Sequence, residues 1–125
     1  MISSSKKILI VDDDHRNIFA LNAVLKARGY LCETASNAFD GIEKLRSDDQ
    51  IGIILMDMMM PDMDGYEAIS NIRSNRQTAA IPIIAVTAQA MQGDKERCLA
   101  AGANGYVSKP VDVDLLTELL QNHLK

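Results

Sequence analysis

Residues able to do chemistry follow four apolar runs of this 125-residue chain. Asp12 and Asp13 follow ILIV, Asp57 follows IGIILM, Thr87 follows IPIIAV, and Lys109 follows GYVS. A single polar residue after an apolar run usually marks the place where a buried strand meets water. Four such ends that met in one place would instead bring together three carboxylates, a hydroxyl and an ammonium group.

The charges of such a site predict its chemistry. Three carboxylates close together would repel one another and raise each other's pKa unless a cation neutralised them. Oxygen ligands without His or Cys suit a hard ion, and Mg²⁺ first among these. With the ammonium of Lys109 and the hydroxyl of Thr87, the site would accommodate a phosphoryl group beside Asp57. We therefore predict that Asp57 is a nucleophile for phosphoryl transfer and forms an aspartyl phosphate, with little further acid–base machinery.

The strands that must position these residues are predicted from apolar runs. Continuous runs at 8–11, 51–56 and 81–86 are typical of strands buried on both faces. A more polar run at 31–35 is typical of a sheet edge, and a short strand is expected at 105–108. Each strand is separated from the next by a predicted helix. Alternating strands and helices predict an α/β fold with a parallel sheet, helices on both faces, and a site at the carboxyl ends of the strands.

The helices are predicted from apolar spacing and from residues that cap helix ends. They are expected at about 15–28, at 38–45, after an Asp64–Glu67 capping box, at 94–101, and from Asp112 onward. The last helix is expected to bury four leucines, which are Leu115, Leu116, Leu119 and Leu120.

Composition narrows the class of protein. The length suits one domain over 1–125, with residues 1–5 as a flexible N-terminus. No apolar run is long enough to cross a bilayer, and membrane contact by this domain is not expected. The net charge is −4 without a block of basic residues, so direct nucleic-acid binding is not expected either. Two cysteines that are far apart, Cys32 and Cys98, suit reduced thiols and a cytoplasmic location.

The motifs ILIVDDD, ILMDMMMPDMDGYE, IPIIAVTA and GYVSKP resemble those of the receiver domain of two-component response regulators over residues 6–124. The resemblance implies a doubly wound, flavodoxin-like sheet of five strands in the order 2-1-3-4-5. It also implies that the domain is a phosphoacceptor in signalling, able to phosphorylate and dephosphorylate itself, and not an enzyme in the ordinary sense.

The resemblance also implies roles for particular residues. Asp57 would be the phosphoacceptor, and Mg²⁺ would be held by Asp12, Asp13, Asp57 and the backbone carbonyl of Met59. Thr87 and Lys109 would be partners of the phosphoryl group, and Pro110 would follow a cis peptide bond.

The role of Tyr106 has two interpretations. From composition alone it is an aromatic residue half buried on a strand. The resemblance instead makes it a switch that moves inward when Thr87 is drawn toward the phosphoryl group, which would change the surface of the fourth helix and fifth strand. The methionines of the run 56–63 are interpreted as core and loop packing, since thioethers prefer soft ions.

The sequence bears on three rival functions. A haloacid-dehalogenase-type enzyme also uses an Asp nucleophile but requires it to be the first residue of an Asp-x-Asp motif, whereas Met59 stands two residues after Asp57. A flavin-binding module requires a phosphate loop where this chain has three aspartates. A degenerate receiver that serves only as a protein-binding adaptor stays open as an alternative, although no hallmark residue is missing.

The stretch 81–116 is most similar to receivers attached to hybrid sensor kinases. This similarity implies that the phosphodonor is a histidine kinase or a histidine phosphotransfer domain, and the domain is expected to be a monomer or a weak dimer.

Overall fold

The computed structural model describes residues 6–61, 63–88 and 93–124. The expected flexible N-terminus at 1–5 lies outside these residues. Five strands and five helices alternate in the described part of the chain, in the order β1 (Lys7–Val11), α1 (His15–Ala27), β2 (Leu31–Ala35), α2 (Ala38–Ser47), β3 (Ile51–Asp57), α3 (Gly65–Ser74), β4 (Ile83–Thr87), α4 (Asp94–Ala101), β5 (Gly105–Ser108) and α5 (Val113–His123).

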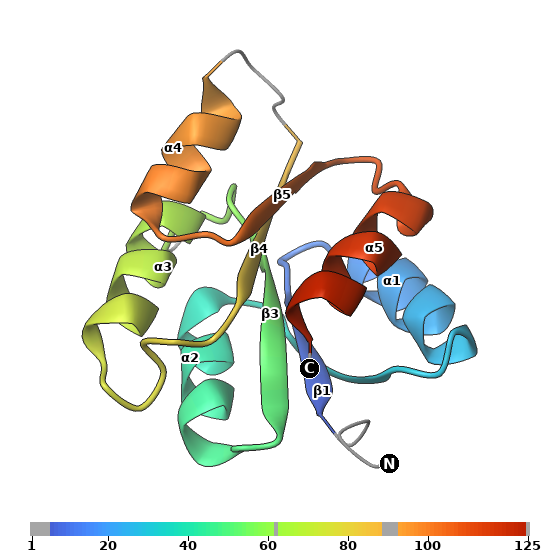
Figure 1. The fold of residues 1–125 in the computed structure, drawn as a ribbon, viewed down its shortest axis with the longest axis horizontal. Helices are drawn as coiled ribbons and strands as arrows, with labels where there is room; N and C mark the ends of the chain where they lie inside the picture. The colour runs from blue at the N-terminus through green and yellow to red at the C-terminus, as the bar shows by residue number, and fades with distance from the viewer. Residues whose placement is uncertain (1–5, 62, 89–92, 125) are drawn as a thin grey trace.

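The strands form one parallel sheet in the order β2-β1-β3-β4-β5. Figure 1 shows α1 and α5 on one face of this sheet and α2, α3 and α4 on the other. The predicted fold class, strand order and two-sided covering by helices are therefore confirmed.

Alternate residues of each inner strand enter two separate cores. In β1, Ile8 and Ile10 pack in the core under α1 and α5, and Leu9 and Val11 pack in the core under α2, α3 and α4. All four side chains are buried, which explains why an inner strand reads as an unbroken apolar run.

Four of the helices begin at a residue whose side chain accepts a backbone N–H of the first turn, and these residues are Asp14, Asn37, Asp64 and Asp112. Such caps replace hydrogen bonds that the first turn of a helix cannot make internally. The bond from the Glu67 N–H to Asp64 is the half of the predicted capping box that the structure shows.

Two predictions were wrong, one of a strand boundary and one of the burial of a side chain. The strand expected at 81–86 is β4 at Ile83–Thr87, because Pro82 has no N–H to donate to the neighbouring strand. Leu115 was expected to be buried, but 45% of it is exposed. It lies about a third of a helical turn away from the line of Leu116 and Leu120, which faces the sheet.

No helix in the described part of the chain is both long enough and apolar enough to cross a bilayer.

Arg73, at the end of α3, joins three segments that lie far from the charged strand ends. Its guanidinium donates to the carbonyl oxygens of Gly102 (2.7 and 3.1 Å), Ala79 (2.9 Å) and Ile81 (2.6 Å), and to Oδ1 of Asn104 (2.8 Å). Partial burial lowers the pKa of Arg73. This single side chain therefore satisfies backbone carbonyls before β4 and after α4.

Arg73→Lys is expected to lower the free energy of unfolding by about 2–4 kcal/mol, because an ammonium group cannot reproduce the planar fork of donors and leaves carbonyls without a partner. Urea unfolding with circular dichroism would measure the loss. Arg76→Lys, at an exposed position three residues later, is the matched control. An equal effect of both substitutions would contradict this role of Arg73.

Candidate functional site

The carboxyl ends of the inner strands bring the predicted residues together. β1 pairs with β3, so Asp12, just after β1, lies beside Asp57, the last residue of β3. Thr87 ends β4, and Lys109 follows β5 directly. Each of three residues, Asp12, Asp57 and Thr87, is only 2% exposed to solvent. This convergence is the one that the strand pattern predicted.

Asp12, Asp13 and Asp57 form an acidic cluster. One carboxylate oxygen from each residue lies within 4.8 Å of the others. Asp12 and Asp57 are buried, whereas Asp13 is exposed, so the cluster opens to solvent on the side of Asp13. Three oxygen donors at this spacing, without nitrogen or sulfur donors, fit a hard divalent cation such as Mg²⁺.

Lys109 is the counter-charge to this cluster. Its Nζ lies 3.1 Å from Oδ2 of Asp12 and 3.6 Å from Oδ2 of Asp57. Burial alone would lower the pKa of Lys109, but the hydrogen bond to Asp12 and the charge of Asp57 outweigh it and raise this pKa above the ordinary value. The ammonium is therefore held charged between the two buried carboxylates.

Hydrogen bonds from nearby groups orient the carboxylates. Oδ1 of Asp57 accepts from the Met59 N–H at 3.0 Å, and Oδ1 of Asp12 accepts from the Asp14 N–H at 2.8 Å. Oδ2 of Asp12 also accepts from the side-chain amide of Asn17 at 2.6 Å. Asn17 was not predicted from the sequence. Its position five residues after Asp12, in the first turn of the predicted helix, was the only signal for it.

The pKa of Asp57 is raised from its ordinary value of 3.8 to about 6. Burial is the main cause, and the charge of Asp12 adds to it, whereas the Met59 N–H and Lys109 act in the opposite direction. A carboxyl group that is costly to ionise here would become easier to ionise beside a bound cation. The acidic cluster is thus an environment that favours cation binding.

The end of β5 is tied to the end of β4. The backbone N–H of Lys109 donates to the Thr87 carbonyl at 2.7 Å, and the Lys109–Pro110 peptide bond is cis. The backbone bond holds Lys109 beside the end of β4, and its Nζ lies next to Asp12 and Asp57 of the acidic cluster.

The loop after Asp57 packs closely on the start of α3. A Cβ on Gly65 would lie 2.6 Å from the Cα of Met58, closer than real atoms approach, so only glycine fits there. Met58, Met60 and Met63 are buried, which agrees with their interpretation as packing residues. Met59 differs from them, because half of it is exposed.

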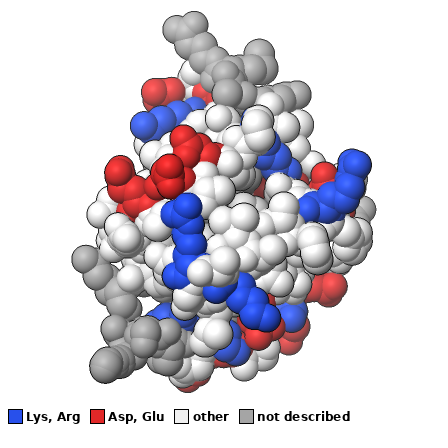
Figure 2. All heavy atoms as spheres, turned by 90° about the vertical axis from the view of Figure 1, so that its right-hand side faces the viewer, with Lys and Arg blue, Asp and Glu red and all other residues white. Residues whose placement is uncertain are grey.

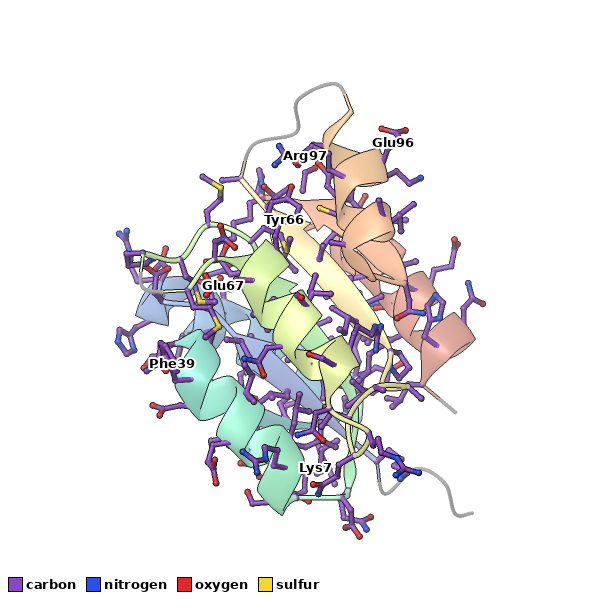
Figure 3. All side chains as sticks on the ribbon, turned by 90° about the vertical axis from the view of Figure 1, so that its left-hand side faces the viewer. Lys7, Phe39, Tyr66, Glu67, Glu96 and Arg97 are labelled. Carbon is purple, nitrogen blue, oxygen red and sulfur yellow. The ribbon has the colours of Figure 1, made fainter. Side chains whose placement is uncertain are left out.

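A hollow of about 600 Å³ opens beside the acidic cluster. Its wall includes Asp13, Met59 and Thr87, together with Tyr66, Asp94 and Arg97 from α3 and α4. Figure 3 shows Tyr66 and Arg97 close together where α3 and α4 begin.

Tyr106 lies on the same sheet face as this hollow and is half buried against the core under α2, α3 and α4. Two residues later, Ser108 pairs with Thr87 in the sheet. The Tyr106 hydroxyl donates to Oδ2 of Asp94 at 3.2 Å, a partner that the sequence did not indicate.

A family model described as the response regulator receiver domain matches residues 8–121. The sensor histidine kinase RcsC of Escherichia coli (strain K12) is 41% identical over 113 residues, which are 90% of this chain and 12% of RcsC. The chain therefore spans only a small part of the length of that relative.

Two solved structures are also similar. The receiver domain of sensor histidine kinase PA1611 from Pseudomonas aeruginosa PAO1, with a magnesium ion coordinated in its active site cleft, is 35% identical with a TM-score of 0.86 and covers 96% of this chain and 98% of its own. A second match comes from the co-crystal structure of the Saccharomyces cerevisiae histidine phosphotransfer protein Ypd1 and the receiver domain of its downstream response regulator Ssk1. It is 26% identical with a TM-score of 0.85, and the match covers 96% of this chain and 89% of the other.

The strand ends, the acidic cluster with its lysine, and a family match over nearly the whole chain agree with one another, and the chain belongs to the family of response regulator receiver domains.

Proposed function

We propose that residues 1–125 form one receiver domain that accepts a phosphoryl group on Asp57 from a phosphohistidine. The observation that carries this proposal is the placement of the buried Asp57 carboxylate within 4.8 Å of two other acidic oxygens and 3.6 Å from the Lys109 ammonium. In the reaction, the bond between phosphorus and the donor imidazole breaks, and a bond between phosphorus and a carboxylate oxygen of Asp57 forms. The electron pair of the broken bond remains on the imidazole nitrogen.

Asp12, Asp13 and Asp57, with the backbone carbonyl of Met59, would hold a Mg²⁺ ion. When bound, the ion would offset the charge of the carboxylates and of the phosphoryl oxygens. The PA1611 receiver, with its magnesium ion in the cleft, supports this assignment. Lys109 would pair with the phosphoryl group from the other side, and the Thr87 hydroxyl would donate a hydrogen bond to it.

We propose that the phosphodonor is a histidine kinase or a histidine phosphotransfer domain. The receiver domain itself is proposed to be cytoplasmic. The similarity to RcsC and to the Ypd1–Ssk1 structure supports the donor. Basic and acidic side chains are interspersed on the face of the molecule that Figure 2 shows, which supports a protein partner over a nucleic acid. The domain would act as a monomer or weak dimer and would also lose its phosphoryl group by self-catalysed hydrolysis.

The signal is proposed to leave the site through Thr87 and Tyr106. When Thr87 moves toward the phosphoryl group, the Tyr106 ring would turn inward, and the surface formed by α4 and β5 would change. The half-buried place of Tyr106 on the sheet face beside the hollow supports this role.

Incubation with a small phosphodonor such as acetyl phosphate tests the proposal. With Mg²⁺, intact mass spectrometry is expected to show the mass of one added phosphoryl group, and EDTA is expected to suppress it, because the clustered carboxylates then repel the incoming group. Calcium, a larger ion with looser geometry, serves as the control cation. Failure to label with Mg²⁺, or equal labelling in EDTA, would contradict the proposed mechanism.

A further inference from the structure

Asp94, the first residue of α4, joins three elements through one carboxylate. Its Oδ1 accepts from the hydroxyl of Tyr66 on α3 at 3.0 Å, and its Oδ2 accepts from the hydroxyl of Tyr106 on β5 at 3.2 Å. Each tyrosine therefore uses a different oxygen. The carboxylate is partly buried, and a bond to an ionised acceptor is stronger than one between neutral groups.

Two further contacts hold Tyr66 beside Asp94. The Arg97 guanidinium lies over its ring, with 4.8 Å between Cζ and the ring centroid. Its hydroxyl is also 3.8 Å from Sγ of Cys98, which is buried. With the hydroxyl of Tyr66 on Oδ1, the remaining oxygen Oδ2 is directed to Tyr106. Burial and the bond to Asp94 raise the pKa of Tyr106, so its hydroxyl keeps the proton that it donates.

This arrangement lies next to the proposed phosphoryl site. Tyr66 and Asp94 line the same hollow as Asp13 and Thr87. A shift of Thr87 toward a phosphoryl group would open space for Tyr106 on one side, while Asp94 retains the Tyr106 hydroxyl on the other. The two interactions therefore compete for the position of one side chain.

We propose that Asp94 is a latch that holds Tyr106 in the half-buried position seen here, which is assigned to the unphosphorylated domain, and that Tyr66 positions this latch. This inference rests on the proposed switch role of Tyr106. A move of Tyr106 further inward would draw its hydroxyl away from Asp94 and break this bond, so the latch lowers the population of the conformation that accepts a phosphoryl group. Asp94 is thus a positioning residue that acts through Tyr106.

Removal of the latch is expected to speed phosphoryl uptake. Asp94→Ala should accept the phosphoryl group from acetyl phosphate and Mg²⁺ about fivefold faster than wild type, the ratio that corresponds to one ordinary hydrogen bond. Tyr106→Phe, which keeps the ring and removes the hydroxyl, should show a similar gain. Combining the two substitutions should add nothing, because both remove the same bond.

Glu96→Gln is the matched control. It removes a negative charge from the same first turn of α4, but Glu96 is exposed, and the hydrogen bonds of Tyr66 and Tyr106 in the described residues go to Asp94 and Cys98. Its uptake rate should equal that of wild type. A gain equal to that of Asp94→Ala would show that charge near α4, and not the bond to Tyr106, sets the rate.

A spectroscopic measurement separates the latch from a merely structural role. The chain has three tyrosines, so ring-labelled tyrosine gives three sets of NMR signals that single Tyr→Phe variants assign. In unphosphorylated Asp94→Ala, the Tyr106 signal should move part of the way toward its position in phosphorylated wild type. A loss of helix stability alone would lower the melting temperature without this shift and without faster uptake.

The outcomes distinguish the latch from the proposed function. Suppose that wild type takes up the phosphoryl group and its Tyr106 signal shifts. If Asp94→Ala then takes up the group no faster, and its unphosphorylated Tyr106 signal is not shifted, the latch is wrong and the proposed function stands. If Asp94→Ala gains the same factor in the Tyr106→Phe background, Asp94 does not act through Tyr106, and the latch is again wrong. Wild type that does not label at all refutes the proposed function instead. Should Asp94→Ala fail to fold, Tyr106→Phe alone tests the bond, and an unchanged rate would overturn the proposal.

Discussion

Replacing Asp57 with Asn is expected to abolish phosphoryl uptake and, at the same time, to stabilise the metal-free domain at neutral pH. Uptake is lost because an amide oxygen is a poor nucleophile and the amide also weakens the acidic cluster. The gain in stability follows from the buried position of Asp57, where the charged carboxylate is unfavourable. Phosphoryl transfer and metal-free stability therefore respond to the same substitution in opposite directions.

The sign of the stability effect follows from the pKa of Asp57. In the folded domain this pKa is raised from 3.8 to about 6, so folding favours the protonated form. The favourable contribution is complete below about pH 4 and is lost as the pH rises through about 6. At pH 7 the ionised group costs up to about 3 kcal/mol, and Asp57→Asn is expected to recover about 1–3 kcal/mol of it.

Urea unfolding in EDTA at pH 7 and at pH 4.5 measures this effect, because the difference between variant and wild type should shrink at the lower pH. Asp49→Asn, at an exposed position, is the control and should show little change at either pH. Saturating Mg²⁺ should raise the free energy of unfolding of wild type above that of Asp57→Asn, since the ion binds only the folded acidic cluster. A variant that still takes up the phosphoryl group would contradict the assignment of Asp57, and one that is less stable at pH 7 in EDTA would contradict the electrostatic account.

The meeting of the charged and polar strand ends could be predicted from sequence because it depends on one topological rule. In a parallel sheet, every strand carries the residue that follows it to the same edge. Asp12, Asp57, Thr87 and Lys109 each follow an apolar run, and the structure brings these strand ends together. No knowledge of helix packing was needed for that prediction.

Residues whose role depends on packing between helices were not predicted. Asp94 meets its two donors across 28 and 12 residues of sequence, and no local pattern relates these positions. Asn17 reaches back to Asp12 only because α1 begins at the end of β1. The exposure of Leu115 and Met59 was not predicted for the same reason. Leu115 was expected to be buried and Met59 was grouped with the packing methionines, but the exposure of each depends on which neighbours the helix and the loop face.

Lys109→Met is expected to destabilise the metal-free domain and to slow phosphoryl uptake. The substitution keeps most of the length of the side chain but removes the charge that lies 3.1 Å from Asp12 and 3.6 Å from Asp57. Two buried carboxylates then face each other without this cation. Removing one partner of a buried ion pair costs several kcal/mol, and we expect about 2–3 kcal/mol here because the Lys109 side chain is partly exposed.

Mg²⁺ separates the two roles of Lys109. Since the ion can neutralise the carboxylates but cannot replace the ammonium beside the phosphoryl group, Mg²⁺ should reduce the loss of stability while uptake stays about 10- to 100-fold slower than in wild type. Urea unfolding with and without Mg²⁺, and mass spectrometry after exposure to acetyl phosphate, measure the two effects. Lys26→Met, on the exposed face of α1, is the control. If Mg²⁺ restores uptake to the wild-type rate, Lys109 serves only to neutralise Asp12 and Asp57, and its proposed contact with the phosphoryl group is wrong.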